Sequence, residues 1–211
     1  MNIKERIMSL TKSTVQEFTE LLASKTSVPG GGGASSLVAS IGVALGDMVG
    51  EFTVGKKKYA DVEPEILKLM EQAQDIRVKL LECIDEDAVA FEPLSKAYGI
   101  PKEDPSRDEI MEKCLKDAAA VPFKILQLAC EAIDLQRQFA DKGSVIMISD
   151  AATGVALLQG AIKGAAVNVK INTKSMKDRA YASDLDAKVE ELLRKYDKLA
   201  TEIYDDVVNR L

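Results

Sequence analysis

The sequence predicts an all-α protein: an antiparallel up-and-down bundle of long helices, in which residues 1–211 form a single domain. Apolar residues recur at intervals of three and four along most of the chain, which is the spacing of one helix face. The 211 residues contain no repeat, and no linker is long enough to divide them. Polar segments with glycine or proline separate the apolar stretches and set the expected helix ends.

The first two expected helices flank a run of four glycines. Ser13 or Thr14 can cap a short helix that ends near Ser24. The segment PGGGG at 29–33 is expected to be a loop, and a second helix follows over about residues 34–53. This helix is rich in alanine, serine and glycine, so neighbouring helices can approach it closely.

Two long helices are expected next. Pro64 suits the first turn of a helix that runs to about Tyr98. The loop IPKEDPSRDE contains two prolines, and a fourth helix covers about residues 106–140, with a kink expected at Pro122.

The last third of the chain contains two more helices. DKGS at 141–144 interrupts the pattern, and a fifth helix rich in small residues covers about residues 145–165. NVKIN at 168–172 is expected to be an extended or irregular connection. The final helix, over about residues 178–210, has apolar residues at helical spacing.

Composition excludes several classes of function. The net charge is −6 and aromatic residues make up 5%, so we expect no nucleic-acid partner. No apolar run is expected to approach the length of a membrane span, and the opening MNIKERIMSLTKSTVQEF lacks a signal-peptide core. Cys83, Cys114 and Cys130 are widely spaced and fit buried thiols. We therefore expect a cytoplasmic protein without a membrane partner.

The chain contains no histidine. Ser-His-Asp and Cys-His nucleophilic mechanisms are therefore excluded, as are metal sites built from histidine. In an enzyme of this composition, Asp, Glu, Lys, Tyr, Cys or water must transfer the protons.

One carboxylate interrupts the apolar stripe of the third helix. Asp85 and Glu86 fall off this stripe and are expected to be solvated, whereas Asp87 lies on it. A carboxylate in such a seam costs several kcal/mol unless it is paired or hydrogen-bonded. Asp87 either forms a structural hydrogen bond or ion pair, or lies where the seam turns toward solvent. Alternatively, it lines an internal cavity, where desolvation raises its pKa toward that of a general base. The stripe comprises Ile66, Leu69, Ala73, Ile76, Leu80, Cys83, Asp87, Ala90 and Leu94.

The other candidates each have a structural alternative. The glycine run offers backbone N–H groups to an anion, or it is a flexible loop beside closely packed helices. It lacks the Lys-Ser/Thr pair of a P-loop and the preceding strand of a dinucleotide fingerprint. Lys56, Lys57 and Lys58 either are solvated or bind an anionic ligand tail, and Ser149 with Asp150 can cap a helix.

Seven motifs occur in order along the chain: PGGGG at 29–33, GKKKY at 55–59, DEDAVAF at 85–91, AYGIPK at 97–102, AAAVPFKI at 118–125, KGSVIMISDA at 142–151 and NVKIN at 168–172. This set resembles the cyclodeaminase/cyclohydrolase family over nearly the whole chain. Members of that family include the C-terminal half of formiminotransferase-cyclodeaminase and free-standing methenyltetrahydrofolate cyclohydrolases. The resemblance implies a helical homodimer that acts on one-carbon derivatives of tetrahydrofolate without a metal or another cofactor.

The resemblance also assigns residues. It implies that Asp87, within IDEDAVAF, is catalytic, and that the glycine loop belongs to the folate pocket, where a flat ring could lie against bare backbone. Asp150 could orient water or Asp87, and Glu51 departs from the family pattern, which more often has a neutral amide. The pocket residues implied are Pro29, Gly30, Gly31, Gly32, Gly33, Ser149, Asn168 and Lys170, with Lys56, Lys57 and Lys58 at the glutamate tail.

Two reactions of this family are open. The expected one is hydrolysis of 5,10-methenyltetrahydrofolate to 10-formyltetrahydrofolate, favoured because no formiminotransferase domain accompanies these 211 residues. The alternative is 5-formiminotetrahydrofolate cyclodeaminase, which releases ammonia and forms the methenyl bridge. An alternative of another class is a non-enzymatic helical module that binds partner helices, with Asp87 specifying only the packing register.

Overall fold

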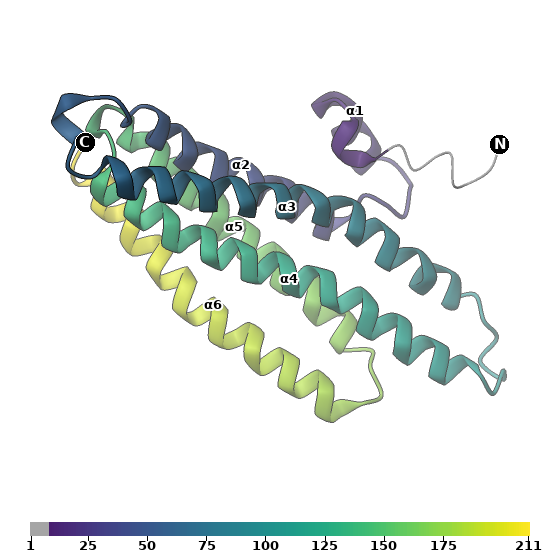
Figure 1. Cartoon of the computed structure of the whole chain (residues 1–211). Coiled ribbons are helices and arrows are strands. Elements are labelled where there is room, and N and C mark those ends of the chain that lie inside the picture. Colours follow the sequence, from purple (N-terminus) through teal and green to yellow (C-terminus); the bar gives the residue numbers. More distant parts are fainter. Residues whose placement is uncertain (1–8) are drawn as a thin grey trace.

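The computed structural model describes residues 9–211, and every regular element in that range is helical (Figure 1). The predicted all-α class is confirmed. Of the opening segment MNIKERIMSLTKSTVQEF, residues 1–8 lie outside the described range. The elements are η2 (Leu10–Lys12), α1 (Val15–Leu22), α2 (Gly31–Glu51), η3 (Lys57–Tyr59), α3 (Glu63–Ala97), α4 (Arg107–Lys142), η4 (Val145–Met147), α5 (Ile148–Thr173) and α6 (Arg179–Val208).

The helix ends follow from local chemistry. Thr14 caps α1 in a reciprocal capping box, because its hydroxyl accepts from the Glu17 N–H and the Glu17 carboxylate accepts from the Thr14 N–H. Pro64 lies in the first turn of α3. The Asp178 carboxylate accepts from the Tyr181 N–H and caps α6. These three starts confirm the sequence prediction.

Two expectations about helix ends are wrong. α2 begins at Gly31 rather than near residue 34, so three of the four glycines form its first turn instead of a loop. NVKIN is the end of α5, not an extended or irregular segment. There the Asn168 side chain donates to the Gly164 carbonyl and the Asn172 side chain to the Asn168 carbonyl, one turn back in each case. Glycine and asparagine have low intrinsic helix propensity, but tertiary packing and these side-chain hydrogen bonds keep both segments helical.

Five long helices, α2 to α6, enclose the core. α2 packs against α3 and α5, α4 packs against α3 and α5, and α6 covers α5 and α4 (Figure 1). α3 and α4 have 35 and 36 residues, whereas α2 has only 21. The start of α2 therefore lies against the middle of α3, with the short α1 beside it (Figure 1). Pro122 lies inside α4, which continues as a helix on both sides of it.

Glycines let α2 and α5 approach closely, as the sequence predicts. A Cβ atom on Gly42 would lie 2.8 Å from the carbonyl oxygen of Gly154, and the reverse distance is the same. The buried Gln136 side chain of α4 fills the space that remains, and its Nε2 donates to the Gly42 carbonyl at 2.6 Å. Any larger side chain would force the two helices apart.

Within residues 9–211, two segments have the length and apolar composition of membrane spans. They are Gly31–Glu51 and Val145–Thr173, with mean hydropathies of 1.4 and 1.6. The expectation that no apolar run reaches this length is therefore wrong. Of their most apolar 18 residues, 56% and 44% are buried inside the structure. The absence of a membrane partner stays a prediction.

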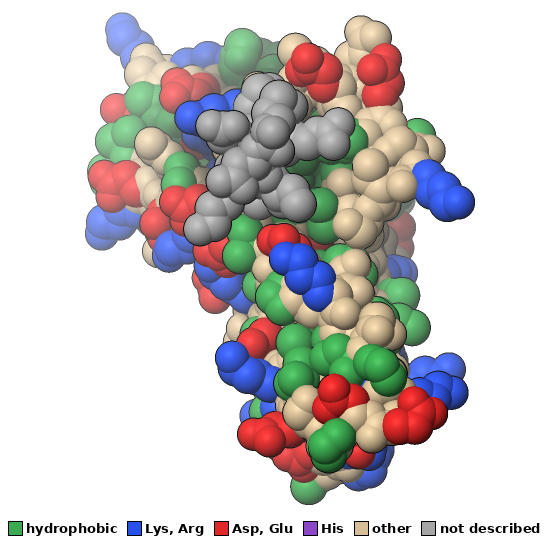
Figure 2. All heavy atoms as spheres, turned by 90° about the vertical axis from the view of Figure 1, so that its right-hand side faces the viewer, with side chains coloured by type: hydrophobic (Ala, Val, Ile, Leu, Met, Phe, Trp, Pro, Cys, Tyr) green, Lys and Arg blue, Asp and Glu red, His purple; other side chains and the backbone are tan. Residues whose placement is uncertain are grey.

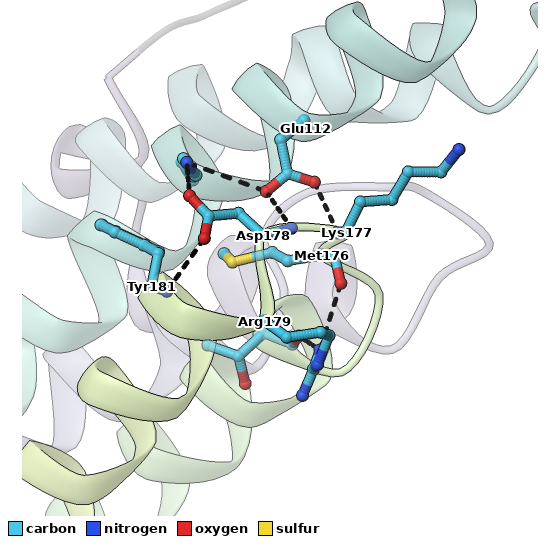
Figure 3. Close-up of polar contacts among 8 residues, drawn as sticks. Glu112, Met176, Lys177, Asp178, Arg179 and Tyr181 are labelled. Atoms are coloured by element: carbon cyan, nitrogen blue, oxygen red, sulfur yellow. Dashed lines mark hydrogen bonds and ion pairs between the residues drawn. The ribbon is translucent and has the colours of Figure 1, made fainter.

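The turn between α5 and α6 is attached to α4 through one carboxylate. Glu112 accepts hydrogen bonds from the backbone N–H groups of Lys177, at 2.6 Å, and Asp178, at 3.2 Å (Figure 3). Arg179 of α6 donates to the carbonyls of Thr173 and Met176 in the same turn. These bonds hold the C-terminal end of α5 in place, which matters because that end forms part of the cavity described next.

Candidate functional site

A cavity of about 170 Å³ lies where the first turn of α2 meets α3, α4 and the end of α5. Glycine backbone forms one side of it, and apolar side chains from three helices form much of the rest. Its polar side chains come from segments that are far apart in the sequence. The lining residues are Ser27, Val28, Gly30, Gly31, Gly32, Asp87, Phe91, Ala118, Pro122, Asn168, Ile171 and Asn172.

Asp87 is the acid of this cavity. The seam predicted on α3 is confirmed, since Ile66, Leu80 and Cys83 are buried, and Asp87 lies half-buried on the same stripe. Its Oδ2 accepts a hydrogen bond from the Gly33 N–H at 3.0 Å. Burial raises the pKa of Asp87, and the Gly33 bond opposes that rise only in part. Within residues 9–211 no lysine or arginine forms an ion pair with this carboxylate.

At two of the four glycines, a side chain of another helix occupies the space that a Cβ atom would need. A Cβ atom on Gly32 would overlap the Asp87 carboxylate, 2.6 Å from Oδ2 and nearer still to Oδ1. A Cβ atom on Gly31 would lie 2.8 Å from the Asn168 Nδ2. Gly33 would make only ordinary contacts, and Gly30 none within 4 Å. Glycine at position 32 is therefore what lets the carboxylate reach the start of α2.

The acids beside Asp87 both have partners: the expectation that they are solvated is wrong for Asp85, whereas the Glu86 side chain is still 41% exposed. Asp85 accepts from the Ser9 hydroxyl at 2.6 Å and from the Leu10 N–H at 2.7 Å, which attaches the N-terminal segment to α3. Glu86 pairs with Lys124 of α4 at 2.8 Å. Both side chains are half-buried.

The cysteines are buried free thiols, as expected. Burial raises the pKa of Cys83 to about 12, and the same cause raises that of Cys130 to about 12. Thiols with these pKa values stay protonated at neutral pH and are poor nucleophiles.

Pro122 and Asn172 are coupled across the cavity wall. Proline has no N–H, so the Ala118 carbonyl, one turn earlier in α4, lacks its usual helical donor. The Asn172 side chain supplies the missing bond: its Nδ2 donates to the Ala118 carbonyl at 3.2 Å and to the Asn168 carbonyl at 2.9 Å. Both N–H groups of the Asn172 amide therefore donate to backbone carbonyls.

The structure gathers some predicted site residues and separates others. Asp87, Gly30, Gly31, Gly32 and Asn168 line the cavity. Pro29 is buried directly before it, and Gly33 binds Asp87.

Six predicted residues lie away from the cavity. Lys56, Lys57 and Lys58 follow the opposite end of α2, about 30 Å away at 1.5 Å per residue. Ser149 and Asp150 lie in the first turn of α5, and Lys170 pairs with Glu190 of α6 outside the cavity. Their roles stay predictions.

The sequence did not predict the other residues of the cavity wall, which are Ser27, Val28, Phe91, Ala118, Pro122, Ile171 and Asn172. The sequence contains a pattern that indicates Asn172, because Asn168 and Asn172 are four residues apart and lie on one face of a helix. The pattern is informative only if NVKIN is predicted to be helical. No group of three or more Cys, Asp or Glu side chains in the described part of the chain is placed to hold a metal ion.

Comparisons with known proteins agree with this architecture. A sequence profile of the family described as formiminotransferase-cyclodeaminase matches residues 14–191. A methenyltetrahydrofolate cyclohydrolase from Methylorubrum extorquens is 36% identical over 202 residues, which cover 94% of this chain and 97% of that one. The crystal structure of formiminotetrahydrofolate cyclodeaminase from Thermotoga maritima superposes with a TM-score of 0.81 at 28% identity, covering 93% of this chain and 98% of that one.

Longer proteins contain a similar segment. The formimidoyltransferase-cyclodeaminase of Dictyostelium discoideum is 32% identical over 201 residues, which cover 95% of this chain. This chain spans 37% of that protein's length.

Replacing Asp87 by Asn should stabilise the fold at neutral pH. Burial raises the pKa of Asp87 in the folded protein above its value in the unfolded chain. The free energy of unfolding therefore falls as the pH rises and Asp87 loses its proton. We expect Asp87→Asn to raise the Tm at pH 7, and the gain to shrink as the pH falls through the folded-state pKa and to vanish below the unfolded one. Thermal unfolding across this range measures it, and a gain that grows on acidification would contradict the assignment.

Proposed function

The chain belongs to the formiminotransferase-cyclodeaminase family, and we propose that it hydrolyses 5,10-methenyltetrahydrofolate to 10-formyltetrahydrofolate with Asp87 as the general base. The observation that carries the proposal is the Asp87 carboxylate, which is half-buried, bonded to the start of α2, free of an ion pair and open to a cavity. The hydrolysis is favoured because the similar cyclohydrolase matches this chain over nearly the full length of both. No metal or organic cofactor is part of the proposal.

The position of Asp87 suits both halves of the reaction. Its carboxylate takes a proton from the water that attacks the methenyl carbon, which gives a hydroxyl adduct between N5 and N10. The acid then returns this proton to N5 as the carbon–N5 bond breaks, and the hydroxyl proton leaves as the formyl C=O forms. A raised pKa supports this cycle, because it makes the Asp87 carboxylate a stronger base toward the attacking water.

A second reaction could use the same site. In 5-formiminotetrahydrofolate cyclodeamination, N10 attacks the formimino carbon and ammonia leaves, again through a tetrahedral carbon between the two nitrogens. The similarity to the Thermotoga maritima cyclodeaminase supports this candidate. A non-enzymatic helical module is the remaining alternative, and it predicts no turnover of either folate.

We further propose that two such antiparallel bundles form a homodimer through the outer faces of α2 and α5. These adjoining helices expose apolar side chains, among them Ile41 and Met48 of α2 and Val167 of α5, and carry few charges. Exposed apolar side chains on neighbouring helices that carry few charges are a feature of protein interfaces. A two-fold arrangement could also bring the lysines at residues 56–58, with Ser149 and Asp150, toward the cavity of the other copy.

The first test is the near-ultraviolet absorbance of methenyltetrahydrofolate mixed with the purified protein. We expect the signal to disappear faster than it does spontaneously, and Asp87→Asn to slow turnover by about 10²- to 10⁴-fold while the protein stays folded. Appearance of the signal from 5-formiminotetrahydrofolate, with release of ammonia, would instead support cyclodeamination. No change with either compound would overturn the enzymatic proposal.

The glycine at position 32 provides a second test. Gly32→Ala places a methyl group within the space of the Asp87 carboxylate, so the acid must move, and a shift of about 1 Å can cost about 10²-fold in rate. Gly33→Ala adds the same methyl at ordinary contact distances, 3.6 Å or more, and should lose far less activity. Equal turnover by the two variants would argue against a positional role for Gly32.

The homodimer predicts a molar mass twice that of the 22.9 kDa chain. Ile41→Glu places a charge on the exposed face of α2 and should shift the protein to monomer, since an unpaired charge buried in an interface is costly. Val78→Glu, at a similarly exposed apolar position of α3, is the matched control and should leave the mass unchanged. Light scattering coupled to gel filtration measures both, and a monomeric wild-type protein would refute the proposed dimer.

A further inference from the structure

Asn172 presents a free hydrogen-bond acceptor to the cavity. Its side chain is only 8% exposed, and both of its amide N–H bonds point at the backbone carbonyls of Ala118 and Asn168. Turning the amide over would place its oxygen against those two carbonyl oxygens, so the orientation is fixed by its neighbours. The Oδ1 atom accepts no hydrogen bond from any residue of the described range.

This oxygen is not sealed inside the protein. Among the described residues, the fully buried side-chain atoms that lack a hydrogen-bond partner are Gln136 Oε1 and Ser144 Oγ. Asn172 Oδ1 is not one of them, and Asn172 lines the cavity. Its free oxygen is therefore accessible from the cavity, where an N–H donor of a ligand can reach it.

The side chains that α3 and α5 contribute to the cavity wall present mainly acceptors, whereas the first turn of α2 on the opposite side contributes backbone N–H donors. Asp87 contributes its carboxylate, and the Asn168 amide directs its nitrogen to the Gly164 carbonyl at 2.8 Å. Beside Asp87 and Asn172 this arrangement favours a ligand group that carries N–H donors, because a carboxylate placed there would face the Asp87 carboxylate and leave the Asn172 oxygen unpaired. This distinguishes the two ends of a folate, because the glutamate tail carries carboxylates whereas the pyrimidine ring of the pteridine carries an amino group.

The size and shape of the cavity also favour the pteridine end of a folate. The cavity volume of about 170 Å³ is below the range of about 300–1,000 Å³ that buries a drug-sized ligand, so one fused ring fits but an entire folate does not. Phe91, Pro122 and Ile171 supply apolar walls for a flat ring. The 2-amino group lies at the opposite end of the pteridine from its side chain, so it is the donor that reaches deepest.

We propose that Asn172 Oδ1 accepts a hydrogen bond from the 2-amino group of the pteridine, so that the pteridine end of the substrate, and not its glutamate tail, occupies the cavity beside Asp87. This inference rests on the proposed folate function. Pro122 takes part indirectly: by leaving the Ala118 carbonyl without its helical donor, it fixes the direction of the Asn172 amide.

The test compares two ligands by isothermal titration calorimetry: tetrahydrofolate and its 2-desamino-2-methyl analogue, which replaces the amino donor by a group of similar size. We expect the wild-type protein to bind tetrahydrofolate about 10-fold more tightly, the effect of one lost hydrogen bond to a buried acceptor. In Asn172→Leu this ratio should fall to about one. Asn209→Leu, an exposed asparagine at the end of α6, is the matched control and should keep the wild-type ratio.

A ratio near one in the wild-type protein would overturn the proposal without any variant, which matters if Asn172→Leu does not fold. An unchanged ratio in a folded Asn172→Leu would overturn it as well. Turnover of methenyltetrahydrofolate by the wild-type protein distinguishes the failure of this inference from the failure of the folate function. If the protein hydrolyses methenyltetrahydrofolate but binds the two ligands equally well, only the role of Asn172 is refuted. Failure to bind either ligand, with no turnover, refutes the folate function itself.

Discussion

The contact between the Asp87 carboxylate and the first turn of α2 is the interaction on which the candidate site depends. A half-buried acid without a cation is costly, and here the Gly33 N–H and the positive end of the α2 dipole offset part of that cost. The contact is possible only because position 32 has no side chain. The remaining cost lowers the stability of the fold at neutral pH.

The rest of the bundle holds the two sides of this contact in place. Gly42 and Gly154 let α2 pack directly on α5, and Gln136 donates to the buried Gly42 carbonyl at their crossing. At the other end of α5, Glu112 binds the backbone of the following turn (Figure 3). The cavity is therefore framed by helix ends that are fixed by their neighbours, which suits a site that must hold a ligand and a carboxylate in register.

Surface composition divides the molecule into two regions. Along α3, α4 and α6, ion pairs such as Lys79–Asp75 and Lys188–Asp184 cover the solvent side. One face of the molecule, seen end-on from the right of Figure 1, shows green apolar patches between scattered charges (Figure 2). The outer sides of α2 and α5 carry few charges, which contributes to the high mean hydropathy of these two helices. Small apolar residues serve helix packing and helix association alike, so composition does not distinguish these uses.

The sequence by itself determined the helical class, most helix starts and the position of Asp87 in an apolar seam, because these depend on local spacing and capping. It could not show that the glycines are helical, that NVKIN closes the cavity, or that Asp85 and Glu86 are bonded. Only the tertiary structure decided these, because each depends on a partner distant in sequence: Gly32 on Asp87, Asn172 on the carbonyl freed by Pro122, and Asp85 on Leu10. It also separated the lysines at residues 56–58 from the cavity, since a 21-residue helix lies between them.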